Sequence, residues 1–132
     1  MVIILTEDRS VSYNRENSEE RRLPMDAKEL PSCPVETTLT LISNKWKVLI
    51  LRDLMTGTKR FGVLKKSLGQ VSQKVLTAQL REMEADGLLT RTVYPEVPPR
   101  VEYTLTELGC SLKPILDAMW VWGEAYKKER TE

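Results

Sequence analysis

Residues 72–105, SQKVLTAQLREMEADGLLTRTVYPEVPPRVEYTL, decide the fold of this chain. In the first part of the stretch, Leu76, Leu80 and Met83 recur at the i, i+4 and i+7 spacing of a narrow apolar stripe on a helix. This segment carries its own start and stop signals, Ser72 and Gly87. We therefore expect a well-delimited helix over 72–86.

Two runs of β-branched and aromatic residues follow, at 88–94 and 100–105, and their alternation predicts two strands. Their connector, PEVPPR, has three prolines and no glycine, where a plain hairpin would use Asn-Gly or Asp-Gly. The prolines fix φ and favour an extended, stiff tip that presents Arg100. Glu96 in this tip would repel a phosphate unless it pairs with Arg100 or Arg91.

Upstream of this stretch, RFGVLKKSL (60–68) predicts a short helix, and GQV turns the chain into the helix over 72–86. A short helix, a tight turn and a longer capped helix make a helix-turn-helix, and a following β-ribbon makes it winged. Before it, residues 44–55 predict a helix capped by Asn44, and a first helix begins after Ser32, which suits its N-cap.

Downstream, Thr106 caps a C-terminal helix that runs to about Lys128, and Pro114 is expected to bend or split it. The expected fold is mainly α with a small β-ribbon, a winged helix-turn-helix. Two segments are expected, a mobile N-terminal arm (1–31) and a winged-helix domain (32–128), whose DNA-binding and dimerisation roles are considered below.

Composition narrows the function classes. The chain has no histidine, and Cys33 and Cys110 are isolated, so no metal site and no cofactor are predicted. A glycine-rich phosphate loop and a base for a Ser or Cys nucleophile are also missing, so the sequence does not predict an enzyme. No apolar run is long enough for a membrane span and no signal peptide is evident, so we expect a cytoplasmic protein that does not engage a membrane.

Charge is strongly segregated along the chain, although the net charge is only +1. Residues 45–81 hold nine Lys and Arg against one acid, Asp53. Such a directed positive field favours a polyanion, double-stranded DNA, as partner. The alternatives are an ordinary solvated helical surface and a winged-helix module that binds protein without binding DNA.

On a helical wheel, Lys74, Thr77, Ala78 and Arg81 lie opposite the apolar stripe of the 72–86 helix. This small, basic face can enter a major groove, and it meets no acid until Glu84 near its far end. Free amides at the start of the helix also favour a phosphate. The predicted DNA-binding residues are Lys59, Arg60, Lys65, Ser72, Gln73, Lys74, Thr77, Arg81, Arg91 and Arg100.

The blocks CPVETTLTLISNKWKVLILRDL, KRFGVLKKSL, VSQKVLTAQLREMEADGLLTRTVYPEVPPRVEYTLTELG and ILDAMWVWG resemble those of the HxlR-type winged-helix transcriptional regulators of bacteria. The resemblance runs from about Cys33 to Tyr126. It implies a homodimeric DNA-binding regulator whose terminal helices build the dimer. The sequence departs from the family pattern at SLGQV, where a proline-glycine pair is more usual, and at Cys110, where a basic or polar residue is more usual.

The C-terminal helix is the predicted dimer interface, because its apolar residues exceed what one small domain would cover. The residues that form one stripe are Leu108, Leu112, Ile115, Met119, Trp122 and Tyr126, with Trp120 and Val121 extending it around the helix. The alternative is that this helix packs entirely on the chain's own core. Two-fold symmetry would predict a pseudo-palindromic operator.

Cys33 is a candidate redox sensor, since it precedes Pro34 at the start of the first helix, where free amides favour a thiolate. Some regulators that the sequence resembles use the cysteine of the CPVE block to sense oxidants or electrophiles. A small-molecule or oxidant effector is therefore a candidate partner. The alternative is a small apolar residue packed beneath Trp46. For Cys110, a place early in the last helix suggests packing.

Overall fold

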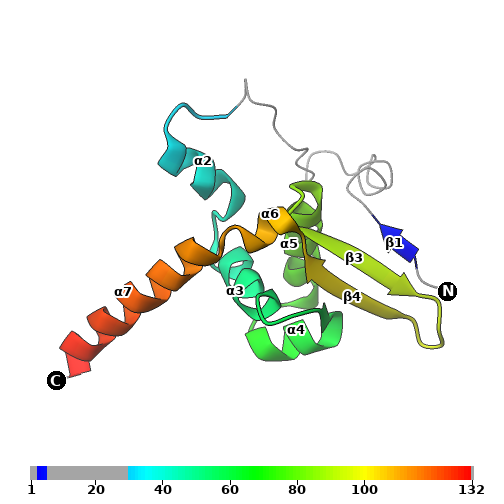
Figure 1. The fold of residues 1–132 in the computed structure, drawn as a ribbon. Helices are drawn as coiled ribbons and strands as arrows, with labels where there is room; N and C mark the ends of the chain where they lie inside the picture. Colours follow the sequence, from blue (N-terminus) through cyan, green and yellow to red (C-terminus); the bar gives the residue numbers. More distant parts are fainter. Residues whose placement is uncertain (1–2, 6–29, 132) are drawn as a thin grey trace.

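The computed structural model describes the backbone of residues 3–5 and all of residues 30–131. Figure 1 shows a body of three helices with a β-ribbon on one side and a long helix leaving on the opposite side. The helices of the body are α3 (Lys45–Leu54), α4 (Phe61–Leu68) and α5 (Gln73–Ala85). The ribbon is β3 (Leu89–Tyr94) and β4 (Arg100–Leu105), and the long helix is α7 (Lys113–Thr131).

The sheet is antiparallel with the strand order β1-β3-β4-β2. The ribbon pairs from Leu89 opposite Leu105 to Tyr94 opposite Arg100, as the two predicted strands required. Two short strands that the sequence analysis did not predict flank it, β1 (Ile3–Leu5) against β3 and β2 (Lys59–Arg60) against β4. The helix expected over 60–68 therefore begins at Phe61, because Arg60 is held in the sheet opposite Glu102. The remainder of the arm expected over 1–31 falls almost entirely outside the described residues.

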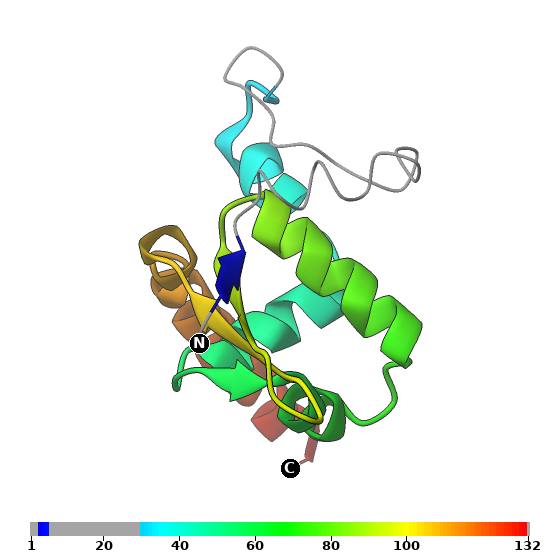
Figure 2. The ribbon, with the colours of Figure 1, turned by 90° about the vertical axis from the view of Figure 1, so that its right-hand side faces the viewer.

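One apolar core joins the three helices to the ribbon. Figure 2 shows α5 lying against α3 and beside the ribbon, and α5 contacts both α3 and β3. Leu76, Leu80 and Met83 are fully buried, which confirms the predicted core face of α5. The core cluster is Ile42, Ile50, Leu51, Leu54, Leu64, Leu68, Val71, Leu76, Leu80, Met83, Leu88, Leu89, Tyr103 and Leu112.

Three of the four predicted helix N-caps are confirmed. Asn44 accepts from the Lys47 backbone N–H, Ser72 from Val75 and Thr106 from Gly109, each satisfying an amide that the helix leaves open. The prediction for Ser32 was wrong. Helix α2 (Pro34–Leu41) has Cys33 as its N-cap, because Pro34 occupies the first helical position.

The C-terminal helix is split, as Pro114 suggested. A short helix α6 (Glu107–Cys110) ends before α7 begins, and Pro114 lies in the first turn of α7, where its missing N–H is not needed. Over the described chain, neither α2 nor α7 contains a buried residue. Both helices therefore leave much of their apolar surface exposed to solvent.

Candidate nucleic-acid interface

The exposed face of α5 is confined to the first two turns of the helix. Lys74 and Ala78 are exposed, and Thr77 is half-buried beside them. Ser72 and Gln73, also predicted to contact DNA, are exposed at the start of the helix. The basic face that the wheel predicts is thus open to a ligand here, at its N-terminal end.

The far end of that face is closed. Glu84 and Ala85, which the wheel placed on the outer side, are only 2% and 1% exposed. Arg81 is half-buried, and its charge acts on the buried Tyr103 hydroxyl. Arg81 therefore lies at the inner limit of the accessible face rather than at its centre.

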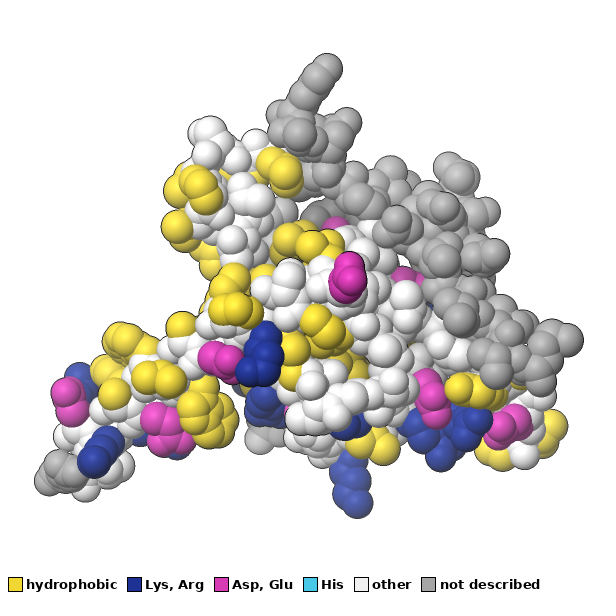
Figure 3. Space-filling view, in the orientation of Figure 1, with side chains coloured by type: hydrophobic (Ala, Val, Ile, Leu, Met, Phe, Trp, Pro, Cys, Tyr) yellow, Lys and Arg dark blue, Asp and Glu magenta, His cyan; other side chains and the backbone are white. Residues whose placement is uncertain are grey.

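A shallow pocket lies between the start of α4, the start of α5 and the ribbon. It brings together five of the ten residues predicted to contact DNA, namely Arg60, Gln73, Thr77, Arg91 and Arg100. Gly62, Phe61, Pro99, Val101 and Tyr103 complete its lining. Figure 3 shows Lys and Arg side chains along the lower border of the body and beneath the ribbon. The exposed start of α5 and the ribbon thus border one concave surface, whose lining includes Arg60, Arg91 and Arg100.

Tyr103 is a member of this surface that the sequence analysis missed. It stands opposite Arg91 in the ribbon register and is 6% exposed. Burial raises the pKa of the Tyr103 hydroxyl, while the positive charge of Arg91 and a hydrogen bond from it act in the opposite direction. The alternation predicted a strand at this position, but it did not indicate that the Tyr103 hydroxyl meets an arginine.

Arg100 is engaged within the wing. Its guanidinium lies 3.3 Å from the Glu96 carboxylate, 3.7 Å from that of Glu102, and 3.8 Å from the centre of the Tyr94 ring. The pairing that would keep Glu96 from repelling a phosphate is therefore present. The tip beyond it is open, with Val97 fully exposed.

The remaining predicted contacts lie on and before α4, outside the pocket lining. Lys65 is half-buried in the last turn of α4. Lys59 donates to the Thr56 hydroxyl at 2.8 Å, so its ammonium is held at the turn that leads into β2. Both cations lie within the basic segment, and neither lines the pocket.

Part of the positive charge counted in the sequence is not available at the surface. Lys47 is 1% exposed, and its ammonium contacts the Glu82 carboxylate at 2.6 Å. Arg52 pairs with Asp53 at 2.9 Å. The count of nine cations and one acid in residues 45–81 therefore overstates the positive charge at the surface. The buried Lys47 is neutralised by Glu82, which lies outside that segment.

The predicted dimer residues divide into two groups. Leu112 is 9% exposed and Ile115 packs against the core, so these two belong to the chain's own interior. In particular, Leu112 was wrongly assigned to an interface, since its side chain has almost no surface left to offer. The exposed group lies further along α7 and comprises Met119, Trp120, Val121, Trp122 and Tyr126, and Leu108 on α6 is exposed as well.

The exposed apolar surface of α7 is partly organised. The Trp122 and Tyr126 rings stack at 5.2 Å, and the Arg130 guanidinium lies 4.0 Å from the Tyr126 ring centre. Helix α2 adds Val35 and Leu39, which are 66% and 52% exposed. Figure 3 shows these two apolar surfaces on the same side of the molecule, away from the wing.

Both cysteines are exposed free thiols. Cys33 is therefore not packed beneath Trp46. The expected packing of Cys110 was also wrong, because α6 buries Gly109 and turns the neighbouring Cys110 outward.

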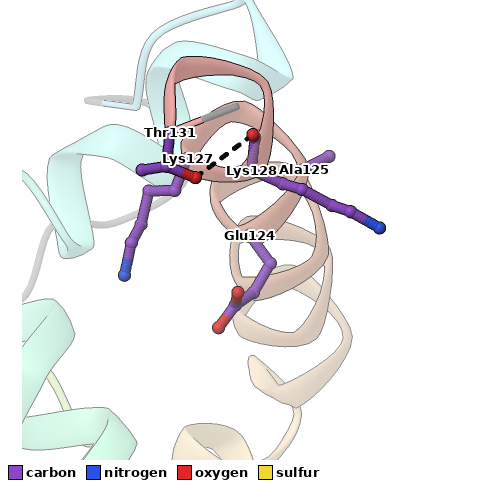
Figure 4. Close-up of a pocket in the computed structure, with 5 residues that line it drawn as sticks. All are labelled: Glu124, Ala125, Lys127, Lys128 and Thr131. Carbon is purple, nitrogen blue, oxygen red and sulfur yellow. Dashed lines mark hydrogen bonds between the residues drawn. The ribbon is translucent and has the colours of Figure 1, made fainter.

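A second depression lies on α7 alone (Figure 4). Its lining is Glu124, Ala125, Lys127, Lys128 and Thr131, and the Thr131 hydroxyl donates to the Lys128 carbonyl at 3.3 Å. All of these residues belong to one exposed helix, so the depression is a feature of the helix surface. Among the described residues, no helix is both long and apolar enough to cross a membrane.

A short helix, a turn, a capped helix and a β-ribbon beside it define a winged helix-turn-helix protein. Residues 41–131 match the family model described as HxlR-like helix-turn-helix, and the chain belongs to this family of transcriptional regulators.

Known proteins agree with this assignment over most of the chain. The HTH-type transcriptional regulator YdeP of Bacillus subtilis is 48% identical over 109 residues, which cover 81% of this chain and 85% of YdeP. The structure of the redox regulator HypR in its oxidised form has a TM-score of 0.67 at 48% identity, covering 70% of this chain and 96% of HypR. The reduced form of the transcriptional regulator YodB from B. subtilis has a TM-score of 0.61 at 37% identity, covering 71% of this chain and 93% of YodB.

Proposed function

We propose that this regulator binds a pseudo-palindromic operator as a homodimer, with α5 in the major groove and the β3–β4 wing against the backbone. The observation that carries the proposal is the concave surface shared by the first turns of α5, the start of α4 and the wing. Arg60, Arg91 and Thr77 line it, and Lys74 stands exposed beside it. Guanidinium and ammonium groups at such a surface suit phosphates and guanine edges.

Lys74, Thr77 and Ala78 on α5 each have a defined part in this proposal. Lys74 reaches a base edge or phosphate, Thr77 donates to either, and Ala78 leaves room for a base methyl group. Ser72 and Gln73 lie at the start of the helix, where open amides favour a phosphate. Lys65 and Arg60 on the α4 side, with Arg91 and Arg100 on the wing, contact the backbone and fix the register of α5.

The proposed dimer uses the apolar surfaces of α7 and α2. Met119, Trp122 and Tyr126 form a continuous exposed stripe, and exposed apolar patches of this kind mark association sites. Two copies related by a two-fold axis would carry two α5 helices, which requires half-sites about one helical turn apart or a multiple of that spacing.

Cys33 is the proposed redox-sensitive residue of this regulator. Its thiol is exposed at the start of α2, next to the apolar surface of that helix. Proteins with similar structures include a redox regulator and a regulator solved in a diamide-treated form. Oxidation of Cys33 to a sulfenic acid or a disulfide would alter the α2 surface and therefore the spacing of the two α5 helices.

An electrophoretic shift titrated with salt tests the proposal. Phosphate contacts release counterions, so duplex affinity should fall steeply and log-linearly as salt rises. A winged-helix module that binds only protein would show no such dependence. A footprint on the DNA flanking the protein's own gene would supply the operator.

A further inference from the structure

Two polar pairs join α3 to the recognition helix α5 inside an otherwise apolar contact. The Asn44 amide Nδ2 donates to the Gln79 Oε1 at 2.8 Å, and the Lys47 Nζ contacts the Glu82 Oε1 at 2.6 Å. We call these four residues the polar bracket.

The two pairs lie in register. Asn44 and Lys47 are three residues apart on α3, and Gln79 and Glu82 are three residues apart on α5, so each helix presents its two members on one flank. The α3 side is itself braced, because the Asn44 Oδ1 accepts the Lys47 backbone N–H at 3.0 Å. The same side chain therefore caps α3 and holds α5.

Burial makes the Lys47 contact specific. The Lys47 side chain is 2% exposed, while the Glu82 side chain keeps 28% of its surface open. A buried ammonium without its carboxylate is strongly destabilising, so any arrangement of α5 that moves Glu82 away is disfavoured. Apolar contacts through Leu76, Leu80 and Met83 are not directional and would tolerate a small shift or rotation of α5.

The flank that carries the bracket is not the flank proposed to meet DNA. On the helical wheel, Gln79 and Glu82 lie to one side of the apolar stripe, whereas Lys74, Thr77 and Ala78 lie opposite it. Lys47 is inside the protein and cannot contact a duplex. An effect of the bracket on DNA recognition would therefore act through the placement of α5.

We propose that the polar bracket sets the register and crossing of α5 on α3, so that Asn44, Lys47, Gln79 and Glu82 are positioning residues for sequence recognition. The inference rests on the proposed DNA-binding function. Base contacts depend on placement to within a hydrogen-bond length, while phosphate contacts carry no sequence information. The bracket should therefore govern the preference for operator over other DNA more than it governs affinity for DNA in general.

The test is the double variant Lys47→Met with Glu82→Leu, which replaces the buried pair with apolar residues and leaves the net charge unchanged. Replacing such a pair by well-packed apolar residues is often neutral or stabilising, so the variant is expected to fold. Two probes are used: the duplex that the parent enriches from a random pool, and a scrambled duplex of the same length. The readout is the ratio of the two affinities at one salt concentration.

We expect that ratio to fall by about tenfold or more, the scale of losing a well-placed base contact. Affinity for the scrambled duplex, its salt dependence and the thermal midpoint should stay close to those of the parent. The matched control is Lys113→Gln with Asp117→Asn, which removes an exposed ion pair on α7 and should leave the ratio unchanged. A folded Lys47→Met/Glu82→Leu variant that keeps the parent's ratio would overturn the inference.

If circular dichroism shows that this variant does not fold, Gln79→Ala decides the matter. Gln79 is half-buried, and its loss leaves the Asn44 cap of α3 intact. The same ratio should fall several-fold, and an unchanged ratio would overturn the inference. A parent protein that enriches no sequence and binds DNA without salt dependence would instead overturn the proposed function itself.

Discussion

The Arg100 guanidinium and the Glu96 carboxylate lie 3.3 Å apart at the base of the wing tip. Arg100 also pairs with Glu102, so in the free protein its guanidinium contacts two carboxylates. If the wing contacts phosphate, the Arg100 guanidinium must reach the phosphate although the Glu96 carboxylate lies beside it. Pairs of this kind, open to solvent, are held weakly, so phosphate can compete for the guanidinium.

Replacing Glu96 with Gln should therefore strengthen binding. The variant removes a negative charge that faces the phosphates and releases one partner of Arg100. We expect the affinity for duplex DNA to rise about two- to fivefold at low salt, with a smaller gain at high salt because the effect is screened. Electrophoretic shifts at two salt concentrations measure it, and Arg100→Ala should bind more weakly than the parent. Equal duplex affinities for the parent, Glu96→Gln and Arg100→Ala would show that the wing tip does not contact DNA.

Much of the fold could be predicted from the sequence because its signals are local. Asn44, Ser72 and Thr106 each precede a helix and cap it, and the 72–86 periodicity identified the α5 core face. The short strand β2 could not be predicted, because two residues have no periodicity and their partners, Tyr103 and Glu102, lie far along the chain. Of the ten residues predicted to contact DNA, the structure brings five together in one pocket.

The errors have physical causes too. Sequence patterns assign lysine and glutamate to the surface, so the burial of Lys47 and Glu84 gave no signal. Apolar spacing on the C-terminal helix likewise did not separate Leu112, which the chain's own core covers, from Trp122, which is 68% exposed. That division depends on where the helix leaves the body.

The exposed stripe of α7 should hold the dimer together. Met119→Ala with Trp122→Ala removes two large side chains that do not support the described core, so the monomer fold should persist. Truncating a large aromatic side chain such as Trp122 in an interface costs about 2 kcal/mol or more. Sedimentation at micromolar concentration should give twice the 15.2 kDa chain mass for the parent and a single chain mass for the variant.

Val97→Ala is the control for this experiment, since Val97 is also an exposed apolar residue but lies at the wing tip. It should sediment as the parent does. A parent that sediments as a monomer at this concentration would contradict the proposed dimer.

Cys33 and Cys110 offer a matched pair for testing redox sensing, because both thiols are exposed. Treatment with diamide should change the parent's affinity for its duplex, and Cys33→Ser should abolish the change while Cys110→Ser retains it. Only Cys33 adjoins the α2 surface assigned to the dimer. If mass spectrometry verifies that Cys33 is oxidised and the parent's affinity for its duplex is unchanged, Cys33 is not a redox sensor.

Gly109 allows α6 to pack closely against the start of the ribbon. A Cβ placed there would collide with the Leu88 carbonyl and lie 3.1 Å from a Leu105 methyl carbon. The backbone cannot move freely at this point, because the Thr106 N–H donates to Leu88 and its hydroxyl donates to Gly87. Gly109→Ala should therefore lower the free energy of unfolding by about 1–3 kcal/mol, the cost of overpacking.

Urea unfolding measures this change, and Gly123→Ala provides the comparison. Gly123 lies within α7, where an added methyl group meets nothing within 4 Å, so alanine should be neutral or slightly stabilising. Equal stability of Gly109→Ala and the parent would show that α6 can shift away from Leu88.

The most direct test of the central claim is a salt titration of duplex binding by Lys74→Ala with Arg81→Ala, beside the parent. Lys127→Ala with Lys128→Ala removes the same charge from the exposed end of α7 and serves as the control. Circular dichroism must show that the first variant is folded, because Arg81 is half-buried. The account predicts a loss of about 1–3 kcal/mol for each residue that reads a base, or a salt slope reduced by about 1 for each that contacts a phosphate, while the control behaves as the parent. Duplex binding by the folded Lys74→Ala/Arg81→Ala variant with the parent's affinity and slope would contradict the placement of α5 in the groove.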